Sequence, residues 1–245
     1  MQIPSAAELL DVWEGALGLT SAHRALRLLA AAEPELSHDE LALLPIGRRD
    51  ARLLQLRESL FGSQLVLVVP CPQCKELIES QLCAADLGFA PDRPPQGTCT
   101  TTSHGYSVSF RLPGSADLIA LAAEAEAGRA RELLLTRCML EARDPQSGAK
   151  RVADLPEAVL ADLATHMEAA DPGAVVELAF ECPVCSHRWQ EMFDIASFLW
   201  HEIHAWAQRT LRDVHALARA YGWREPDVLA LSPTRRQIYL ELCRQ

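Results

Sequence analysis

Two short segments of the chain, Cys71-Pro72-Gln73-Cys74 and Cys182-Pro183-Val184-Cys185, share the pattern Cys-Pro-x-Cys. A CxxC turn points two thiolates at one ion, and two such turns supply the four soft ligands of a tetrahedral zinc site. The sequence therefore predicts one structural Zn²⁺ ion whose ligands are Cys71, Cys74, Cys182 and Cys185. A single pair would be weak evidence, and the matched second pair makes the pattern specific.

The residues around both pairs are typical of β-strands. Residues 64–69 form a continuous apolar run, and in residues 175–180 apolar side chains alternate along one strand face. Strand-like spacing also follows each pair, with Ile78 and Leu82 after the first and Trp189 and Phe193 after the second. We expect each pair to form the turn, or knuckle, of a hairpin. Together, residues 64–85 and 174–194 are predicted to build a small zinc-ribbon sheet.

The cysteine pairs have three alternative interpretations. A redox CxxC motif normally opens a helix, whereas strand-like residues follow both pairs here. Iron could replace zinc, and a knuckle without metal is a further alternative. This last alternative is favoured by Lys75 and Ser186, which stand where such knuckles usually carry a glycine able to adopt positive φ.

The two knuckles are far apart in the sequence, because Cys74 and Cys182 are separated by 108 positions. Closing so long a loop costs only about 1.5 kcal/mol more than closing one of about 20 residues, since loop entropy grows logarithmically. Structural zinc contributes roughly 10 kcal/mol or more in peptides. The long insert is therefore tolerable if it folds on its own.

Composition indicates a globular protein. The chain has 245 residues, is 49% hydrophobic and carries a net charge of −10. It shows no signal-peptide pattern and no apolar run of membrane-spanning length, so we expect a cytoplasmic protein that does not cross a membrane. Eight cysteines in such a protein favour metal binding over disulfides. The acidic balance disfavours non-specific binding to nucleic acid.

The predicted fold class is α+β and mostly α-helical. Residues 1–63 form an N-terminal helical region, residues 86–173 form a long mixed insert between the two halves of the ribbon, and residues 195–245 form a C-terminal helical region. In the N-terminal region, Ser5 caps a first helix, and a helix after Gly47 ends at Gly62.

The insert begins with a turn-rich stretch over residues 91–97. A hairpin follows, with strands over 98–102 and 106–112, and Ser115 is expected to cap a helix over 116–126. Further helices are predicted over 129–141 and 156–170, separated by a loop at 144–148. Cys138 is expected to fill the core of this region.

The C-terminal region contains the strongest helical pattern, over residues 195–221, followed by a short helix over 226–231 and a last helix capped by Ser232 and Pro233. One face of the long helix is apolar. The opposite face carries His201, His204, Gln208, Arg212, His215 and Arg219.

No catalytic constellation is recognisable. His201 and His204 are three residues apart, whereas the zinc-protease motif HExxH needs a spacing of four, and neither a phosphate-binding loop nor a GxSxG elbow occurs. His187 follows the second pair, but four thiolates leave it no ligand position. We expect no enzyme and no small-molecule substrate. The alternative function is a zinc-ribbon nucleic-acid-binding protein that uses Arg235 and Arg236.

Three stretches resemble a known family. They are residues 44–62 (LPIGRRDARLLQLRESLFG), 110–118 (FRLPGSADL) and 221–236 (YGWREPDVLALSPTRR). In this order around the knuckles they resemble baseplate proteins of contractile phage tails and contractile injection systems, the group called T-even-type baseplate hub assembly chaperones. None of the stretches is a catalytic signature.

The resemblance implies a non-enzymatic assembly factor, or a minor component that remains in the phage-tail-like particle. It implies baseplate hub, spike or wedge proteins as partners. Only the four knuckle cysteines transfer as a site.

Overall fold

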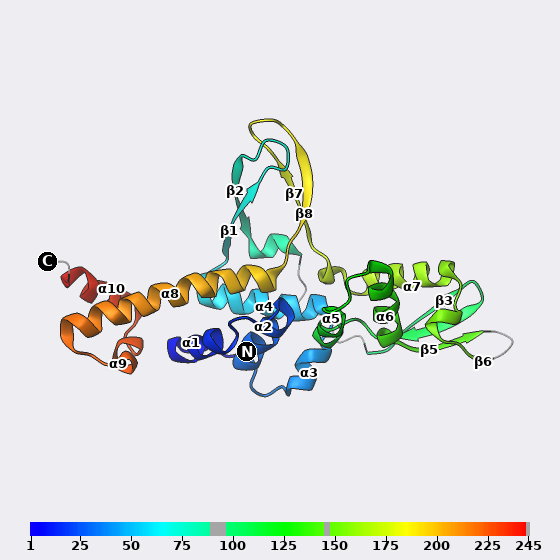
Figure 1. The fold of residues 1–245 in the computed structure, drawn as a ribbon, viewed down its shortest axis with the longest axis horizontal. Coiled ribbons are helices and arrows are strands. Elements are labelled where there is room, and N and C mark those ends of the chain that lie inside the picture. The colour runs from blue at the N-terminus through cyan, green and yellow to red at the C-terminus, as the bar shows by residue number, and fades with distance from the viewer. Residues whose placement is uncertain (89–96, 145–147, 244–245) are drawn as a thin grey trace. The chain divides into compact units, whose positions relative to one another are not determined.

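The computed structural model describes residues 1–88, 97–144 and 148–243, and confirms an α+β fold that is mostly helical (Figure 1). Its contacts divide the chain into two compact units, one made of Met1–Glu35 with Ala196–Gln245 and the other of Leu36–Ile195. Among the described residues, no helix is both long and apolar enough to span a bilayer. The predicted turn at 91–97 and loop at 144–148 lie largely outside the described residues.

The first unit, hereafter the terminal unit, joins the two ends of the chain. Its helices are α1 (Ala6–Gly15), α2 (Ser21–Ala32), α8 (Ile195–Tyr221), α9 (Glu225–Leu229) and α10 (Pro233–Leu242). Ser5 caps α1 and Ser232 caps α10 through their side-chain oxygens, as predicted. Trp13 Nε1 donates a hydrogen bond to His204 Nδ1 at 3.0 Å, so a helix from each end of the chain contributes to this unit.

Helix α8 follows the predicted two-faced pattern over most of its length. Leu199, Ile203 and Leu217 are fully buried, whereas Leu211, at the margin of the apolar face, is 38% exposed and Tyr221, the last residue of the helix, is 41% exposed. On the opposite face, His204 is half-buried against Trp13, and the remaining members of the predicted polar stripe are exposed. The helix ends at Gly222, whose φ of +69° is the left-handed conformation that terminates helices.

The second unit, hereafter the central unit, begins with α3 (His38–Leu43) and α4 (Ile46–Phe61). The start of α4 meets residues 113–114, because Pro45 pairs with Gly114 and the Ile46 N–H donates to the Pro113 carbonyl at 3.0 Å. Two of the family-like stretches, 44–62 and 110–118, therefore join at one junction. A side chain at Gly114 would lie 2.6 Å from the Ala42 carbonyl oxygen, so only glycine fits there.

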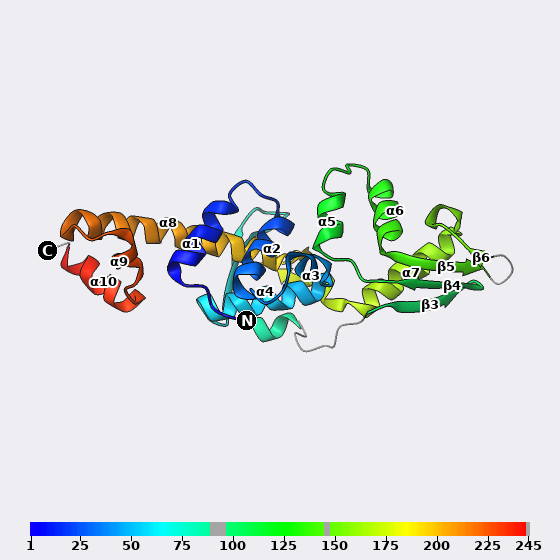
Figure 2. The same cartoon turned by 90° about the horizontal axis from the view of Figure 1, so that it is seen from below.

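The rest of the central unit consists of two cysteine hairpins, described below, and an inserted module. The module contains β3 (Cys99–Ser103), β4 (Tyr106–Phe110), α5 (Ser115–Leu121), α6 (Ala127–Cys138), β5 (Met139–Asp144), β6 (Gly148–Ala149), α7 (Glu157–Ala170) and three short 3-10 turns, η1 (Ala84–Leu87), η2 (Val152–Asp154) and η3 (Pro172–Ala174). Its strands form one antiparallel sheet in the order β3-β4-β5-β6. Helix α7 runs along this sheet (Figure 2).

The inserted module has its own hydrophobic core. Buried residues from β4, α6, β5 and α7 form it, including Phe110, Leu135, Ala142 and Leu163. Cys138 is fully buried in this core, as the sequence predicted. The predicted hairpin is also present, with His104 and Gly105 at positive φ in its two-residue turn. A separate core is what allows this module to be inserted between the two cysteine pairs.

Some element predictions in the module and before it were wrong. The helix predicted over 129–141 ends at Cys138, and the chain continues as strand β5, which pairs with β4. Ser115 is not the N-cap of α5, because Gly114 holds that position and Ser115 is buried in the first turn near Arg49. Helix α3 was not predicted, although Ser37 and Glu40 form the capping box that precedes it.

A buried carboxylate holds the junction side of the module together. Asp117 is fully buried and accepts two hydrogen bonds from Arg111, at 2.6 and 2.8 Å, and one from Arg137 at 2.8 Å. The Gly114 N–H donates a further bond at 3.0 Å. Burial alone would raise the pKa of Asp117, but these hydrogen bonds outweigh it and lower the pKa from 3.8 to about 2.

We predict that Asp117→Asn lowers the free energy of unfolding by about 3 kcal/mol at pH 7, because it leaves two arginines without their shared carboxylate. Urea unfolding measures this. Since the pKa of Asp117 is depressed on folding, its contribution is complete above pH 4 and declines as the pH falls toward 2. The control is Asp154→Asn, in the exposed pair with Arg151, which should lower the free energy of unfolding far less because solvent screens this pair. Equal losses in both variants would contradict the prediction.

Candidate metal centre

Two β-hairpins carry the four predicted ligands. Strands β1 (Gln64–Pro70) and β2 (Leu77–Cys83) form the first, and β7 (Glu177–Glu181) and β8 (Arg188–Met192) form the second. Within the described residues they are two separate two-stranded sheets, not the one ribbon sheet that the sequence predicted. Their registers correspond, because Pro70 pairs with Leu77 and Glu181 pairs with Arg188 on either side of each knuckle.

The second hairpin is supported by an aromatic pair near its knuckle. The ring of Phe180 stacks on that of Trp189 with 5.4 Å between the centroids, and Trp189 stacks in turn on His187. The alternation predicted for this strand is confirmed, since Phe180 is buried and its neighbours Ala179 and Glu181 are exposed. His187 therefore lies against Trp189, and it is not among the four side chains that converge.

Both knuckles use the same backbone hydrogen bonds. In the first, the Cys71 N–H donates to the Glu76 carbonyl at 2.8 Å, and the Lys75 N–H donates to the Cys71 carbonyl at 2.9 Å. In the second, the Cys182 N–H donates to the His187 carbonyl at 2.9 Å, and the Ser186 N–H donates to the Cys182 carbonyl at 2.9 Å. The two turns are therefore the same structure built twice.

Lys75 and Ser186 adopt the left-handed backbone that the missing glycines would normally supply. Their φ angles are +64° and +57°. A non-glycine residue in this conformation costs roughly 1–2 kcal/mol, so the sequence tolerates strain at both knuckles in order to keep their geometry. The sequence alone does not show that Lys75 and Ser186 adopt positive φ. The absence of glycine at these two positions had argued against an intact knuckle.

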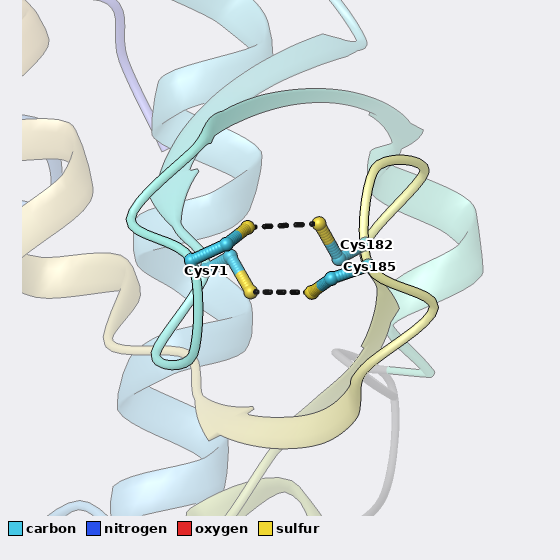
Figure 3. Close-up of side chains that lie close together, drawn as sticks. Cys71, Cys182 and Cys185 are labelled. Atoms are coloured by element: carbon cyan, nitrogen blue, oxygen red, sulfur yellow. Dashed lines mark hydrogen bonds between the residues drawn. The ribbon is translucent and has the colours of Figure 1, made fainter.

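The four thiols converge, as predicted. In Figure 3 side chains from the two hairpins point toward one another, and the ligand sulfurs of Cys71, Cys74, Cys182 and Cys185 all lie within 4.8 Å of each other. Across the gap, the sulfur of Cys71 is 3.7 Å from that of Cys185, and the sulfur of Cys74 is 3.5 Å from that of Cys182. A disulfide needs about 2.05 Å. A tetrahedron with metal–sulfur bonds of about 2.3 Å has edges of about 3.8 Å, which these separations approach.

The electrostatics of the group favour a cation at its centre. Burial opposes ionisation of Cys71, but hydrogen bonds from the Cys74 and Gln73 amides and from neighbouring thiols outweigh it and lower the pKa to about 7. At Cys74, a backbone hydrogen bond from Glu76 favours the thiolate, but burial and the adjacent sulfurs raise the pKa to about 12. One thiol thus ionises readily and its neighbour resists, because thiolates this close repel each other unless a positive ion lies between them.

This arrangement can hold one soft metal ion and little else. Four sulfurs complete a tetrahedral coordination shell, so a bound metal has no open position for a substrate or an activated water. Among the described residues, the four cysteines are the one group of metal-ligating side chains that gathers in this way. The histidine stripe on α8 does not form a second group there, since His204 is engaged by Trp13 and Gln208.

The comparison with protein families matches residues 32–200 to the family described as T4 bacteriophage base plate protein. The chain belongs to this family. The matched range includes both knuckles, the inserted module and the junction of residues 44–62 with 110–118, so the predicted resemblance to baseplate proteins is confirmed. A search of curated proteins and a search of solved structures each found no match.

We predict that Ser186→Pro lowers the affinity of this baseplate-family chain for Zn²⁺ about 100-fold or more. Proline fixes φ near −65° where the knuckle needs +57°, and it removes the N–H that donates to Cys182. Titration with Zn²⁺ against a competing chromophoric chelator measures the affinity. The matched control is Ser186→Gly, which keeps the left-handed backbone and should bind one equivalent as the natural chain does. A proline variant that binds as tightly as the glycine variant would rule out this knuckle as a ligand source.

Proposed function

We propose that this chain is a non-enzymatic assembly factor or minor structural component of a contractile-tail baseplate, and that one structural Zn²⁺ ion joins its two cysteine hairpins. Membership of the baseplate family is the observation that carries the role. In this role the chain binds hub, spike or wedge proteins in the cytoplasm. It is then either released or retained in the finished particle.

The choice of zinc rests on the ligand chemistry. Four thiolates at tetrahedral separations are a common structural zinc set, and iron is the alternative for the same ligands. Strands follow both pairs where a redox dithiol motif would open a helix, which favours a structural metal site over redox chemistry. We propose zinc because four-thiolate zinc sites are common structural metal sites in proteins. In this role the ion holds together two hairpins that no strand pairing joins within the described residues.

Exposed apolar side chains on the hairpins support a binding role. Val66 and Val68 on β1 are 48% and 60% exposed, and Val184 at the second knuckle and Met192 on β8 are 67% and 69% exposed. Isolated two-stranded hairpins are rarely stable by themselves in water. A hairpin pair that is fixed by metal and rich in exposed apolar side chains suits contact with a partner protein.

Co-expression with the neighbouring tail genes tests the proposal. We expect the tagged chain to co-purify with at least one baseplate protein, and mass spectrometry identifies which. If purified particles contain the chain, it is a retained component, and if only assembly intermediates do, it is an assembly factor.

The double variant Cys182→Ser/Cys185→Ser tests whether partner binding depends on the metal site. It removes the second proposed ligand pair and leaves the first. We expect it to lose its zinc and to recover less than about a tenth of the partner. Cys83→Ser/Cys243→Ser, which changes two cysteines outside the group, should behave as the natural chain does. A natural chain that is always recovered alone would contradict the proposed role.

A further inference from the structure

The terminal unit contains a basic groove that the proposed function does not explain. It has a volume of about 1210 Å³ and is lined by α8, α10, the end of α9 and Ala6. Helices α9 and α10 fold back beside the C-terminal half of α8 (Figure 2), packed on it through Leu217, Val228 and Leu240. The groove is therefore a feature of one compact unit.

The charges that line the groove are strongly one-sided. Arg209, Arg212, Arg219 and Arg236 line it together with His215, against the single carboxylate of Asp213 among the described residues. This is unusual in a chain whose net charge is −10. Arg209, Arg212 and Arg219 are exposed, and none of them forms an ion pair within the described part of the chain. Their charges are available to a ligand.

Arg236 is the observation that points most directly to a ligand. It is only 7% exposed, and its Nε is buried without a hydrogen-bond partner among the described residues. Within the described residues its guanidinium makes a single long hydrogen bond, 3.4 Å from Nη2 to the Leu231 carbonyl. A buried guanidinium without a carboxylate is unfavourable, since the charge loses its hydration and gains no counter-charge. An acidic group that enters the groove would supply one.

The spacing of the arginines selects an extended ligand. Arg209, Arg212 and Arg219 lie along one side of α8, and the first and last are separated by about 15 Å at the helical rise of 1.5 Å per residue. A single phosphate cannot reach all of them. Apolar side chains also line the groove, among them Trp206, Leu229 and Leu231. A mixed basic and apolar wall fits a peptide with acidic and apolar side chains better than it fits a sugar-phosphate backbone.

The geometry points to this groove as the docking site for an acidic amphipathic segment of a partner protein, with Arg236 binding a carboxylate at its base. The inference rests on the proposed function only in assigning that segment to a baseplate protein. The charge preference itself can be measured without any baseplate protein.

The test uses the full chain and a fluorescent helical peptide of about 16 residues, with glutamates on one side and leucines on the other. Fluorescence anisotropy should show saturable binding that weakens as NaCl is raised. Arg212→Glu/Arg219→Glu should weaken binding at least tenfold. The matched control is Arg235→Glu, which reverses an exposed charge on α10 outside the groove and should change the affinity less than twofold.

Each further outcome is decisive. Arg236→Met should also weaken binding of the peptide, and circular dichroism should show that this variant keeps its fold. Equal binding of a peptide whose glutamates are replaced by lysines, or no effect of the Arg212/Arg219 reversal, would overturn the inference. Preferential binding of single-stranded DNA of equal charge would assign the groove to nucleic acid and overturn it as well. If the chain co-purifies with baseplate proteins but does not bind the peptide, the docking role of the groove is refuted and the baseplate role is kept. If the chain binds the peptide but does not co-purify with baseplate proteins, the baseplate role alone is refuted.

Discussion

The convergence of four thiols from two distant hairpins is the constraint on which the central unit depends. Cys74 and Cys182 are 108 positions apart, yet their sulfurs approach to 3.5 Å. The two hairpins belong to separate sheets, so no strand pairing joins them in the described residues. In the proposed role, a metal ion at this point supplies the link that the backbone does not. The strain accepted at Lys75 and Ser186 is small beside the free energy that structural zinc contributes in peptides, roughly 10 kcal/mol or more.

A second link lies at the start of α4. The segment that enters α4 pairs with the segment that precedes α5, through Pro45 and Gly114. Close to it, the Gly47 N–H donates to Asp171 at 2.9 Å, and a side chain at position 47 would collide with the backbone of Gly173. Two glycine-dependent contacts thus attach the inserted module, which has its own core, to the start of α4. The range matched to the baseplate family includes both hairpins and this junction.

The sequence predicted those features that depend on local signals. Paired CPxC turns identified the four cysteines that converge, and the long apolar stripe and Gly222 identified α8 and its end. Strand β5 was missed because Met139–Asp144 continues a helical pattern, and its strand conformation depends on pairing with β4. The two hairpins were expected to share a sheet, because nothing in the local sequence shows that they form two separate sheets. The basic groove also escaped prediction: the sequence treats Arg235 and Arg236 alike, whereas the fold of α10 exposes the first and buries the second.

X-ray absorption at the zinc edge of the purified, natural chain tests the central claim most directly. The account predicts a single zinc environment with four sulfur neighbours at about 2.3 Å and no nitrogen or oxygen ligand. A spectrum with fewer sulfurs and with histidine or water in the first shell would contradict it, because then the two knuckles would not close on one ion.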